Sequence, residues 1–329
     1  MEKKQDNLME ISDLTVRYNT DDAVVHAVNN FNLKLVRGEA RGLVGETGAG
    51  KTTLALSILR LLPERVGEVT GGSIVYDGQE LLNLAEAEML PLRGKRISMI
   101  FQDPMTSLNP TQTVGDQILE VLNLHFPEMT REEKNKRVDE MMTLVGIPPQ
   151  RKKSFPHEFS GGMKQRVVIA MALVAEPELL LADEPTTALD VTIQAQILEL
   201  MKQLREKFNT SVMLITHDLG VVAQFCDSVS VVYAGRVVEY GPVEIVFQRK
   251  ENHPYTAGLF NCIPNLHDDQ PRLHPIAGHM ADPRVEYKGC CFTDRCEYAT
   301  ERCRTEAPSM HVCGEHGILC HRYAEKEEF

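Results

Sequence analysis

A glycine-rich segment, GETGAGKT from Gly45 to Thr52, limits the folds that are open to this chain. Its glycines let the backbone curl until several N–H groups point inward at phosphate oxygens, an arrangement that a Cβ would obstruct. In this motif Lys51 reaches the β/γ-phosphates, and the hydroxyl of Thr52 ligates Mg²⁺. Residues 40–44, ARGLV, predict a short buried strand, and residues 52–62 have apolar side chains at helical spacing. Strand, loop and helix in this order predict an α/β fold that binds a nucleoside triphosphate.

A second apolar run, in LLLADE from Leu179 to Glu184, ends in two carboxylates. Four consecutive apolar residues predict a central parallel strand that is buried on both faces. Carboxylates at the end of such a strand, beside a bound Mg²⁺ and a γ-phosphate, can divide the chemistry between them. We assign the metal role to Asp183 and the general-base role to Glu184. The alternative is that both are solvated acids at a strand end.

A third segment, FSGGMKQR from Phe159 to Arg166, lies between the other two. The ordered set resembles the nucleotide-binding subunit of ATP-binding-cassette (ABC) transporters, whose signature is LSGGQ. In that family the signature opens a helix whose N-terminus faces the γ-phosphate held by the other subunit. Ser160 and the amides of the two glycines after it would form such an anion site at a helix start. Phe159 and Met163 depart from the commonest pattern, but the serine and the glycines are retained.

The resemblance also gives roles to single residues. Tyr18 falls where the family stacks an aromatic ring on adenine, the alternative being a tyrosine half-buried in an antiparallel sheet. Gln102 corresponds to the glutamine that touches Mg²⁺ and the lytic water, the alternative being a polar cap on a strand end. His217 matches the switch histidine that hydrogen-bonds the γ-phosphate, the alternative being a structural histidine. Residues 186–190 resemble the loop by which two such subunits touch, and Asp190 can also be the N-cap of the next helix.

The predicted site is therefore a set of residues from several segments. The catalytic residues that the resemblance implies are Glu184, His217 and Gln102, and the Mg²⁺ contacts are Thr52, Gln102 and Asp183. The predicted nucleotide contacts are Tyr18, Gly45, Glu46, Thr47, Gly48, Ala49, Gly50, Lys51, Thr52, Thr53, Gln102, Asp183, Ser160, Gly161 and Gly162.

Composition limits the partners of this 329-residue chain. Its 47 acidic and 35 basic side chains give a net charge of −12, which argues against nucleic acid or an anionic membrane surface as the main partner. There is no run of 18 apolar residues, and the first residues lack the apolar core of a signal peptide. We therefore expect a peripheral protein on the cytoplasmic side of the membrane, docked on separate membrane-spanning subunits.

Hydrophobic periodicity predicts how the chain is organised. Short alternating runs over residues 7–38 and 72–78 predict edge strands. Residues 91–176 are mainly helical in character, with Thr130 and Glu133 as a capping box, and resemble the helical subdomain inserted into cassette ATPases. An amphipathic helix is expected over 190–208, and a hairpin over 228–241 that turns at Ala234 and Gly235. We predict an ATPase domain over 7–262 and a cysteine-rich extension over 263–329.

Six of the eight cysteines crowd into the extension, at 290, 291, 296, 303, 313 and 320. Four of them fit GC-x-F-x-x-RC-x-x-A-x-x-x-C followed later by CH. That pattern, together with HPYTAGL from His253 to Leu259, resembles the C-terminal extension of peptide and nickel importer ATPases, some of which bind a four-iron cluster. We favour a [4Fe–4S] cluster held by Cys290, Cys296, Cys303 and Cys320, with zinc or unligated structural cysteines as the alternatives. Cys291 and Cys313 lie beside these ligands, while a disulfide framework is disfavoured in a reducing cytoplasm. Cys226 and Cys262 are expected to be buried.

Taken together, the resemblance implies the ATP-hydrolysing subunit of an ABC importer of oligopeptides or dipeptides. Two subunits, this chain twice or with a related chain, would sandwich two ATP molecules head to tail, and Mg²⁺ would accompany each. The other implied partners are two membrane-spanning permease subunits and an extracytoplasmic substrate-binding protein. Open alternatives are a nickel-chelate importer, a soluble cassette ATPase acting on nucleic acid, and a non-catalytic regulatory cassette. The intact Glu184 and His217 argue against the last.

Overall fold

The computed structural model describes residues 6–187, 189–248, 250–262 and 275–324. The chain divides into two compact units. The first, which we call the helical unit, comprises the described residues within Met1–Asn7, Leu35–Ala40 and Asn83–Ile215. The second, the phosphate-loop unit, comprises those within Leu8–Lys34, Arg41–Leu82 and Thr216–Phe329.

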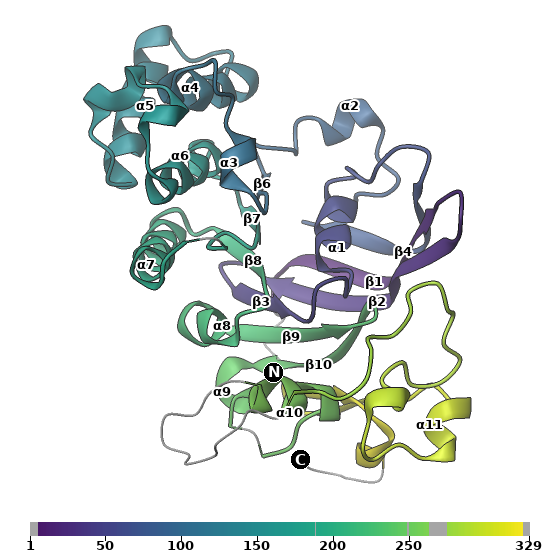
Figure 1. Ribbon diagram of the computed structural model, residues 1–329. Helices are drawn as coiled ribbons and strands as arrows, with labels where there is room; N and C mark the ends of the chain where they lie inside the picture. The colour runs from purple at the N-terminus through teal and green to yellow at the C-terminus, as the bar shows by residue number, and fades with distance from the viewer. Residues whose placement is uncertain (1–5, 188, 249, 263–274, 325–329) are drawn as a thin grey trace. The chain divides into compact units, whose positions relative to one another are not determined.

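The helical unit joins a group of helices to three parallel strands. The strands β6 (Ile97–Ile100), β7 (Leu179–Asp183) and β8 (Ser211–Thr216, of which the unit holds the part up to Ile215) lie in the order β6-β7-β8. Figure 1 shows α4, α5 and α6 gathered into one group. The helices are α2 (Glu86–Met89), α3 (Pro104–Ser107), α4 (Val114–His125), α5 (Arg131–Leu144), α6 (Gly161–Leu173) and α7 (Val191–Phe208), with 3-10 turns at Pro149–Lys153 and Pro156–Glu158.

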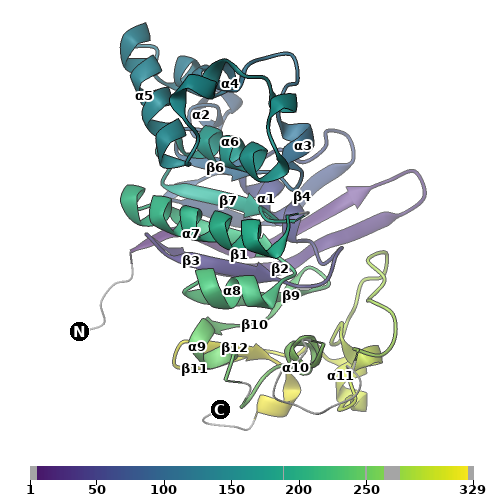
Figure 2. The ribbon, with the colours of Figure 1, turned by 60° about the vertical axis from the view of Figure 1, so that its left-hand side comes forward.

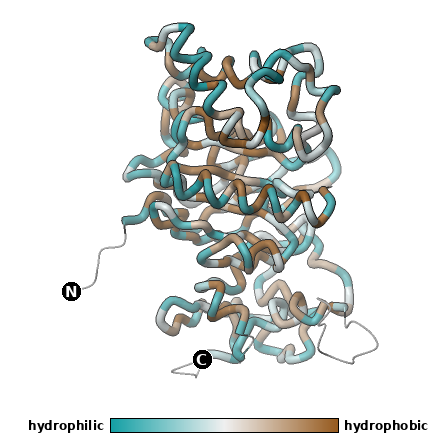
Figure 3. The backbone as a smooth tube through the Cα atoms, turned by 90° about the vertical axis from the view of Figure 1, so that its left-hand side faces the viewer, coloured by the Kyte–Doolittle hydropathy of each residue, from teal (hydrophilic) through white to brown (hydrophobic). Residues whose placement is uncertain are grey.

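Side-chain caps fix the starts of the long helices. The Thr130 hydroxyl accepts a bond from the Glu133 N–H, and the Glu133 carboxylate accepts one from the Thr130 N–H, so the predicted capping box is confirmed. Asp190 caps α7 by accepting from the N–H of Ile193 at 3.0 Å. The helix α7 alternates between hydrophobic and hydrophilic turns in Figure 3, and Ile197, Met201 and other apolar residues make its buried face.

The phosphate-loop unit contains two sheets. One is antiparallel and runs β2-β1-β4-β5, from β1 (Asn7–Asn19), β2 (Val24–Val36), β4 (Gly67–Tyr76) and β5 (Gln79–Glu80). In the other, β3 (Ala40–Val44) pairs in parallel with β9 (Ser228–Tyr233), and β10 (Arg236–Pro242) follows antiparallel. The helices of this unit are α1 (Lys51–Ile58), α8 (Leu219–Phe225), α9 (Val243–Val246), α10 (Pro254–Asn261) and α11 (Glu301–Thr305).

The cysteine-rich extension adds strands to the second sheet of this unit. Its strands β11 (Met310–Cys313) and β12 (His316–Leu319) form a hairpin, and β12 pairs antiparallel with β10. A buried side-chain network accompanies this pairing: Glu239 of β10 is fully buried and lies 2.8 Å from Nε2 of His316. The same carboxylate accepts bonds from the Asn252 amide and the His253 N–H. A buried carboxylate needs such partners.

Burial agrees with the predicted strands. All five residues of β7 and all six of β9 are buried, as expected for strands covered on both faces. The predicted hairpin is confirmed, with Ala234 and Gly235 both at positive φ between β9 and β10. Figure 2 shows β7 beside α7 within the helical unit.

No helix in the part of the chain that the structure describes is long and apolar enough to cross a membrane.

Three details differ from the sequence expectations. The first helix ends at Ile58 rather than near Leu62, because the chain leaves helical geometry at Arg60, whose φ is +52°. The segment expected to be helical contains β6, whose four residues alternate poorly and give no clear strand signal. Cys262 is half-exposed instead of buried, since it follows the last turn of α10.

Candidate nucleotide site

The phosphate loop leads from β3 into α1, as the motif requires. A Cβ on Gly45 would lie 2.2 Å from the carbonyl oxygen of Val232, so only glycine fits there. Gly50, at φ +95°, directly precedes α1, and a Cβ on it would lie 2.2 Å from the carbonyl oxygen of Ala27. Backbone from β2 and β9 therefore presses on the loop and fixes its course. The start of α1 has no side-chain cap, which leaves its amides for a phosphate.

Lys51 is folded back onto the loop. Its ammonium group donates to the carbonyl oxygens of Gly45 at 2.6 Å and Glu46 at 2.9 Å, and the residue is 7% exposed. Thr52 is exposed at the first turn of α1. The long side chain of Lys51 can therefore exchange carbonyl partners for phosphate oxygens without any change in the backbone.

Tyr18 lies on β1 next to the first turn of α1. Its hydroxyl donates to the Thr53 hydroxyl at 3.1 Å, and its ring is half-buried. Two residues predicted to touch nucleotide are thus in direct contact with each other. His217 is exposed where the chain leaves β8, and Asp218 beside it caps α8 by accepting from the N–H of Gly220 at 2.8 Å.

The helical unit brings Gln102 and Glu184 together. The Gln102 amide donates to Oε2 of Glu184 at 3.1 Å, and the Thr187 hydroxyl donates to the same oxygen at 2.9 Å. Asp183, the last residue of β7, is 2% exposed. The two adjacent acids therefore differ in environment, one buried at the strand end and the other half-exposed and held by an amide and a hydroxyl.

Glu184 also has a strained backbone. Its φ is +47°, in the left-handed region that costs an ordinary residue about 1 kcal/mol or more. The strain is held by the Glu184 N–H, which donates to the carbonyl oxygen of Ile215 at 2.8 Å, and by the turn to Thr187. Strain of this kind is typical of functional residues that must point away from a strand.

The signature segment begins α6, as predicted. Ser160 is the N-cap of α6, and its hydroxyl accepts from the N–H of Met163 at 3.4 Å. Gly162 packs against α7, because a Cβ there would lie 2.6 Å from Cγ2 of Ile193. A Cβ on Gly161 would meet nothing closer than Cδ2 of Leu189 at 3.9 Å, so this position, unlike Gly162, has room for a side chain.

Arg151, which the sequence did not indicate as a site residue, contacts both residues that depart from the common signature, Phe159 and Met163. The guanidinium of Arg151 lies 4.2 Å from the centre of the Phe159 ring, and its NH1 lies 3.6 Å from the sulfur of Met163. Its NH2 donates to the carbonyl oxygen of Glu158 at 2.9 Å. The cation of Arg151 interacts favourably with the ring face of Phe159 and with the polarisable sulfur of Met163. The run of basic residues at 151–153 was the only available signal.

A second missed contact joins the phosphate loop to the extension. Arg295 binds the Glu46 carboxylate through two nitrogens, and the Tyr255 hydroxyl accepts from the Glu46 N–H. Neither the spacing nor the chemistry of these residues in the sequence indicates the contact.

The predicted cluster ligands share one electrostatic environment. Burial raises the pKa of the Cys290 thiol, and a charge on Cys303 adds to the effect. Burial also raises the pKa of Cys296, and that of Cys320 to about 11, with a charge on Cys290 contributing to both. Backbone bonds support the group, since the Cys290 N–H donates to the Cys303 carbonyl oxygen at 2.8 Å.

The remaining cysteines are placed differently. All eight cysteines lie among the described residues and all are free, so the disfavoured disulfide framework is not formed. The buried thiol of Cys291 lies 3.9 Å from the Tyr233 carbonyl oxygen, and burial raises its pKa to about 12. Cys313 is at the end of β11. Within the described ranges, no three His, Cys, Asp or Glu side chains are arranged to hold a single metal ion.

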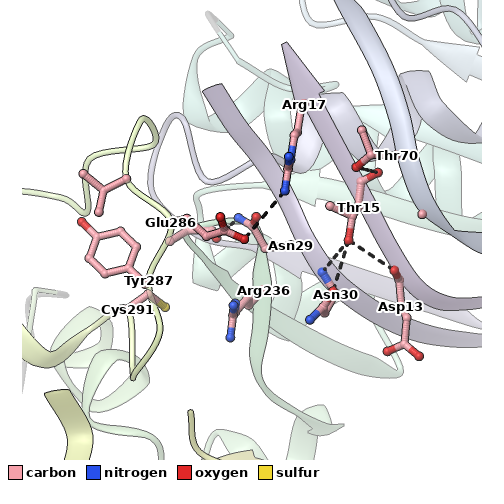
Figure 4. A pocket seen from close by; sticks show the side chains of 13 residues that line it. Asp13, Thr15, Arg17, Asn29, Asn30, Thr70, Arg236, Glu286, Tyr287 and Cys291 are labelled. Carbon is pink, nitrogen blue, oxygen red and sulfur yellow. Dashed lines mark hydrogen bonds and ion pairs between the residues drawn. The ribbon is translucent and has the colours of Figure 1, made fainter. Parts of the chain in front are cut away.

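A polar cavity of about 420 Å³ also lies in the phosphate-loop unit (Figure 4). Arg17 and Glu286 face each other across it, with nitrogen and oxygen 3.7 Å apart. The Thr15 hydroxyl donates to Oδ1 of Asn30 at 3.2 Å on the strand side. No local pattern in the sequence indicates this cavity, because its lining comes from β1, β2, β4, β10 and the segment 285–291.

Two protein families match the chain. The ABC transporter family matches residues 28–187, which span the phosphate loop, the signature and the acidic strand end. The family described as the C-terminal region of oligopeptide and dipeptide transporters matches residues 238–303.

Relatives match over nearly the whole chain. The oligopeptide transport ATP-binding protein OppD of Haemophilus influenzae is 47% identical over 326 residues, covering 98% of this chain and 98% of that protein. OppD of Bacillus subtilis is 48% identical, covering 98% of this chain and 91% of that protein.

Solved structures are similar to the cassette part. A dimeric ATP-binding cassette, MJ0796, bound to ADP and phosphate in a post-hydrolysis state, has a TM-score of 0.64 at 28% identity and covers 71% of this chain and 98% of that chain. The cbiO1 subunit of an ABC transporter from Clostridium perfringens has a TM-score of 0.65 at 30% identity, covering 75% and 92%. The fold is thus the α/β fold of ABC ATPases, and the chain belongs to the family of ABC transporter ATP-binding proteins.

Proposed function

We propose that this ABC ATPase powers the import of oligopeptides. The observation that carries the proposal is the match of residues 238–303 to the C-terminal region of oligopeptide and dipeptide transporters, in addition to full-length similarity to oligopeptide transport proteins. In this reading residues 7–262 are the ATPase domain, with a helical subdomain over about 91–176, and residues 263–329 are the extension.

The site residues divide into binding and chemical roles. The loop from Gly45 to Thr53 cradles the phosphates, with Thr52, Asp183 and Gln102 on Mg²⁺ and Tyr18 on adenine. Glu184 takes the proton of the attacking water, Gln102 orients that water, and His217 bonds the γ-phosphate. The bond from Gln102 to Glu184 and the strained backbone of Glu184 support this assignment.

Two half-sites complete each nucleotide site. The signature residues Ser160, Gly161 and Gly162 would meet the γ-phosphate bound by a second ATPase subunit, either a copy of this chain or a related one. The position of Ser160 and the two glycines at the start of α6 and the similarity to a dimeric cassette support this arrangement. ATP would hold the dimer closed, and hydrolysis would open it. The motion would pass to two permease subunits on the cytoplasmic side of the membrane, with an extracytoplasmic protein delivering the peptide.

Transport in a reconstituted system tests the substrate class. The complex that co-purifies with the chain is placed in lipid vesicles with its binding protein, and uptake of a labelled pentapeptide is measured against uptake of a nickel chelate. We expect peptide accumulation that requires ATP. Nickel accumulation without peptide uptake would support the nickel importer instead. ATP hydrolysis that responds to nucleic acid and not to loaded binding protein would support the soluble cassette reading.

We further propose that Cys290, Cys296, Cys303 and Cys320 hold a [4Fe–4S] cluster. The support is that a charge on one of these thiols raises the pKa of others in the set, in addition to the spacing of the four cysteines in the sequence. When bound, the cluster would supply a covalent staple for a segment with few apolar residues.

Spectroscopy on anaerobically purified protein tests the cluster. We expect a broad absorbance band in the visible range with iron and sulfide in equal amounts, lost in Cys296→Ser and retained in the matched control Cys226→Ser, which alters a cysteine outside the extension. Stoichiometric zinc without iron would overturn the assignment.

A further inference from the structure

Arg295 connects the extension to the phosphate loop. It ends the 3-10 turn Thr293–Arg295, and its NH1 and NH2 donate to the two carboxylate oxygens of Glu46 at 2.7 and 3.0 Å. Glu46 is the second residue of the GETGAGKT motif. The contact is bidentate, the strongest geometry open to an arginine and a carboxylate.

The surroundings hold Arg295 in one position. Its side chain is 5% exposed, and its Nε donates to the carbonyl oxygen of Ala277 at 3.2 Å. Its guanidinium lies 5.8 Å from the centre of the Tyr233 ring and 5.9 Å from that of Phe292. An arginine guanidinium stays cationic at every pH at which the protein is folded. A buried cation placed in this way cannot reach another carboxylate without rearrangement.

Glu46 itself is engaged through three different groups. Its carboxylate binds Arg295, its N–H donates to the Tyr255 hydroxyl at 2.9 Å, and its carbonyl oxygen accepts from Lys51 at 2.9 Å. Burial raises the pKa of Tyr255 above its usual range, so the phenol stays neutral beside the carboxylate. The ring of Tyr255 is fully buried and packs 4.7 Å from the ring of Tyr233. The carboxylate, the N–H and the carbonyl oxygen of Glu46 are therefore all engaged.

The charge on Glu46 explains why such a contact is needed. A carboxylate within a loop that binds phosphates repels them, and the repulsion is strong where water is excluded. The Glu46 side chain is 26% exposed, so solvent screens it only in part. Arg295 removes the repulsion by neutralising the carboxylate and turning it toward the extension.

We propose that Arg295 is a positioning residue for ATP binding: through Glu46 it neutralises and orients the phosphate loop, and so makes the cysteine-rich extension part of the nucleotide site. The inference needs only the ATPase activity of the family and does not depend on the transported substrate or on the cluster.

A cycle of variants separates this role from a merely structural one. Binding of a fluorescent ATP analogue with Mg²⁺ is measured on the full-length chain, together with KM and kcat for ATP. Arg295→Gln leaves Glu46 charged and unpaired, and we expect the dissociation constant and KM to rise about tenfold with kcat within about twofold. Glu46→Gln keeps the backbone of the loop but removes the carboxylate charge, so it should bind the analogue clearly more tightly than Arg295→Gln does. The double variant should bind like Glu46→Gln, because the carboxylate charge that Arg295 neutralises is absent from both.

The control is Arg284→Gln, which removes an exposed arginine that bonds Asp282 in the same extension. It should leave binding unchanged. Arg295→Lys keeps the charge and should recover most of the affinity, and it provides the test if Arg295→Gln does not fold. Unchanged binding in Arg295→Gln would overturn the proposal, as would a double variant as weak as Arg295→Gln, or Arg295→Lys no better than glutamine.

Discussion

The phosphate loop and the signature segment are both glycine-containing starts of a helix, yet they are built in different ways. At the phosphate loop, α1 follows Gly50 without a side-chain cap, and backbone carbonyl groups of other strands touch the loop. At the signature, α6 follows Ser160, whose hydroxyl caps it, and the neighbours are the side chains of Ile193 and Arg151.

Because their neighbours differ, the phosphate loop and the signature segment should tolerate different substitutions. Backbone cannot be exchanged by mutation, so the phosphate loop has no compensating change available at Gly45. Side chains can change together, as Phe159, Met163 and Arg151 illustrate at the signature. A departure from the common pattern is therefore tolerable at α6 and would be severe at the phosphate loop.

The largest effect should come from a residue outside both helix starts. Glu184→Gln removes the proposed general base and preserves the shape of the side chain, because a glutamine oxygen can still accept from Gln102 and Thr187. We expect ATP hydrolysis to fall by about 10²- to 10⁴-fold with ATP binding retained. Phosphate release measures hydrolysis, and a nucleotide-binding assay measures affinity. Together they distinguish loss of the proposed base from damage to the phosphate loop or the signature segment.

The matched control for this variant is Glu199→Gln, an exposed glutamate on α7. It should hydrolyse ATP normally. If Glu184→Gln retained more than about a tenth of the activity, the general-base role would be wrong.

The second prediction compares the glycines directly. Gly45→Ala places a Cβ 2.2 Å from a carbonyl oxygen, so it should cost about 2 kcal/mol of stability and abolish most ATP binding. Gly161→Ala meets nothing closer than 3.9 Å and should stay within about 0.5 kcal/mol. Chemical denaturation and nucleotide binding measure both. An equal loss of stability in Gly45→Ala and Gly161→Ala would show that the backbone neighbours of the phosphate loop do not make it less tolerant than the signature segment.

Local patterns predicted much of this architecture. The strand, loop and helix around Lys51, the capping box at Thr130 and the N-cap at Asp190 follow from side chains that act on their own backbone. The buried run before Asp183 was equally readable, because a strand covered on both faces is continuously apolar.

Contacts between distant segments could not be predicted in the same way. Arg295 and Glu46 are 249 residues apart, and nothing local to either side chain indicates the partner. Arg151 and Phe159 are near in sequence, but their contact depends on the path of two short 3-10 turns. The left-handed backbone at Glu184 was also unpredictable, since it is held by a bond to Ile215 of a neighbouring strand.

We expect low pH to destabilise the phosphate-loop unit through the protonation of His253. This residue caps α10, its Nδ1 accepts from the Tyr255 N–H at 3.1 Å, and burial lowers its pKa to about 3. The folded chain keeps the imidazole neutral while the unfolded chain protonates it near pH 6.5. Stability is therefore full above pH 6.5 and is lost as the pH falls toward 3, by about 1.4 kcal/mol per pH unit.

The variant His253→Asn isolates this effect. Asparagine can still cap the helix but does not titrate, so the pH slope of unfolding should be smaller than in the natural chain. Denaturation at pH 7 and pH 5 measures the slope. The exposed His157, next to the signature, is the control, and His157→Asn should leave the slope unchanged. An identical slope in all three proteins would contradict the assignment.

The smallest expected effect tests whether the signature is braced by side chains. Arg151→Gln removes the contact with the Phe159 ring and the bond to Glu158, and should lower ATP hydrolysis by about threefold, because a cation–π contact contributes about 0.5–1 kcal/mol. In a Phe159→Leu background the same change should matter less, since the ring that the cation contacts is gone. The control Lys153→Gln alters an exposed cation in the same turn and should have no effect. If Arg151→Gln lowers hydrolysis equally in both backgrounds, the arginine acts independently of the ring, and the signature is not held as a coupled set of side chains.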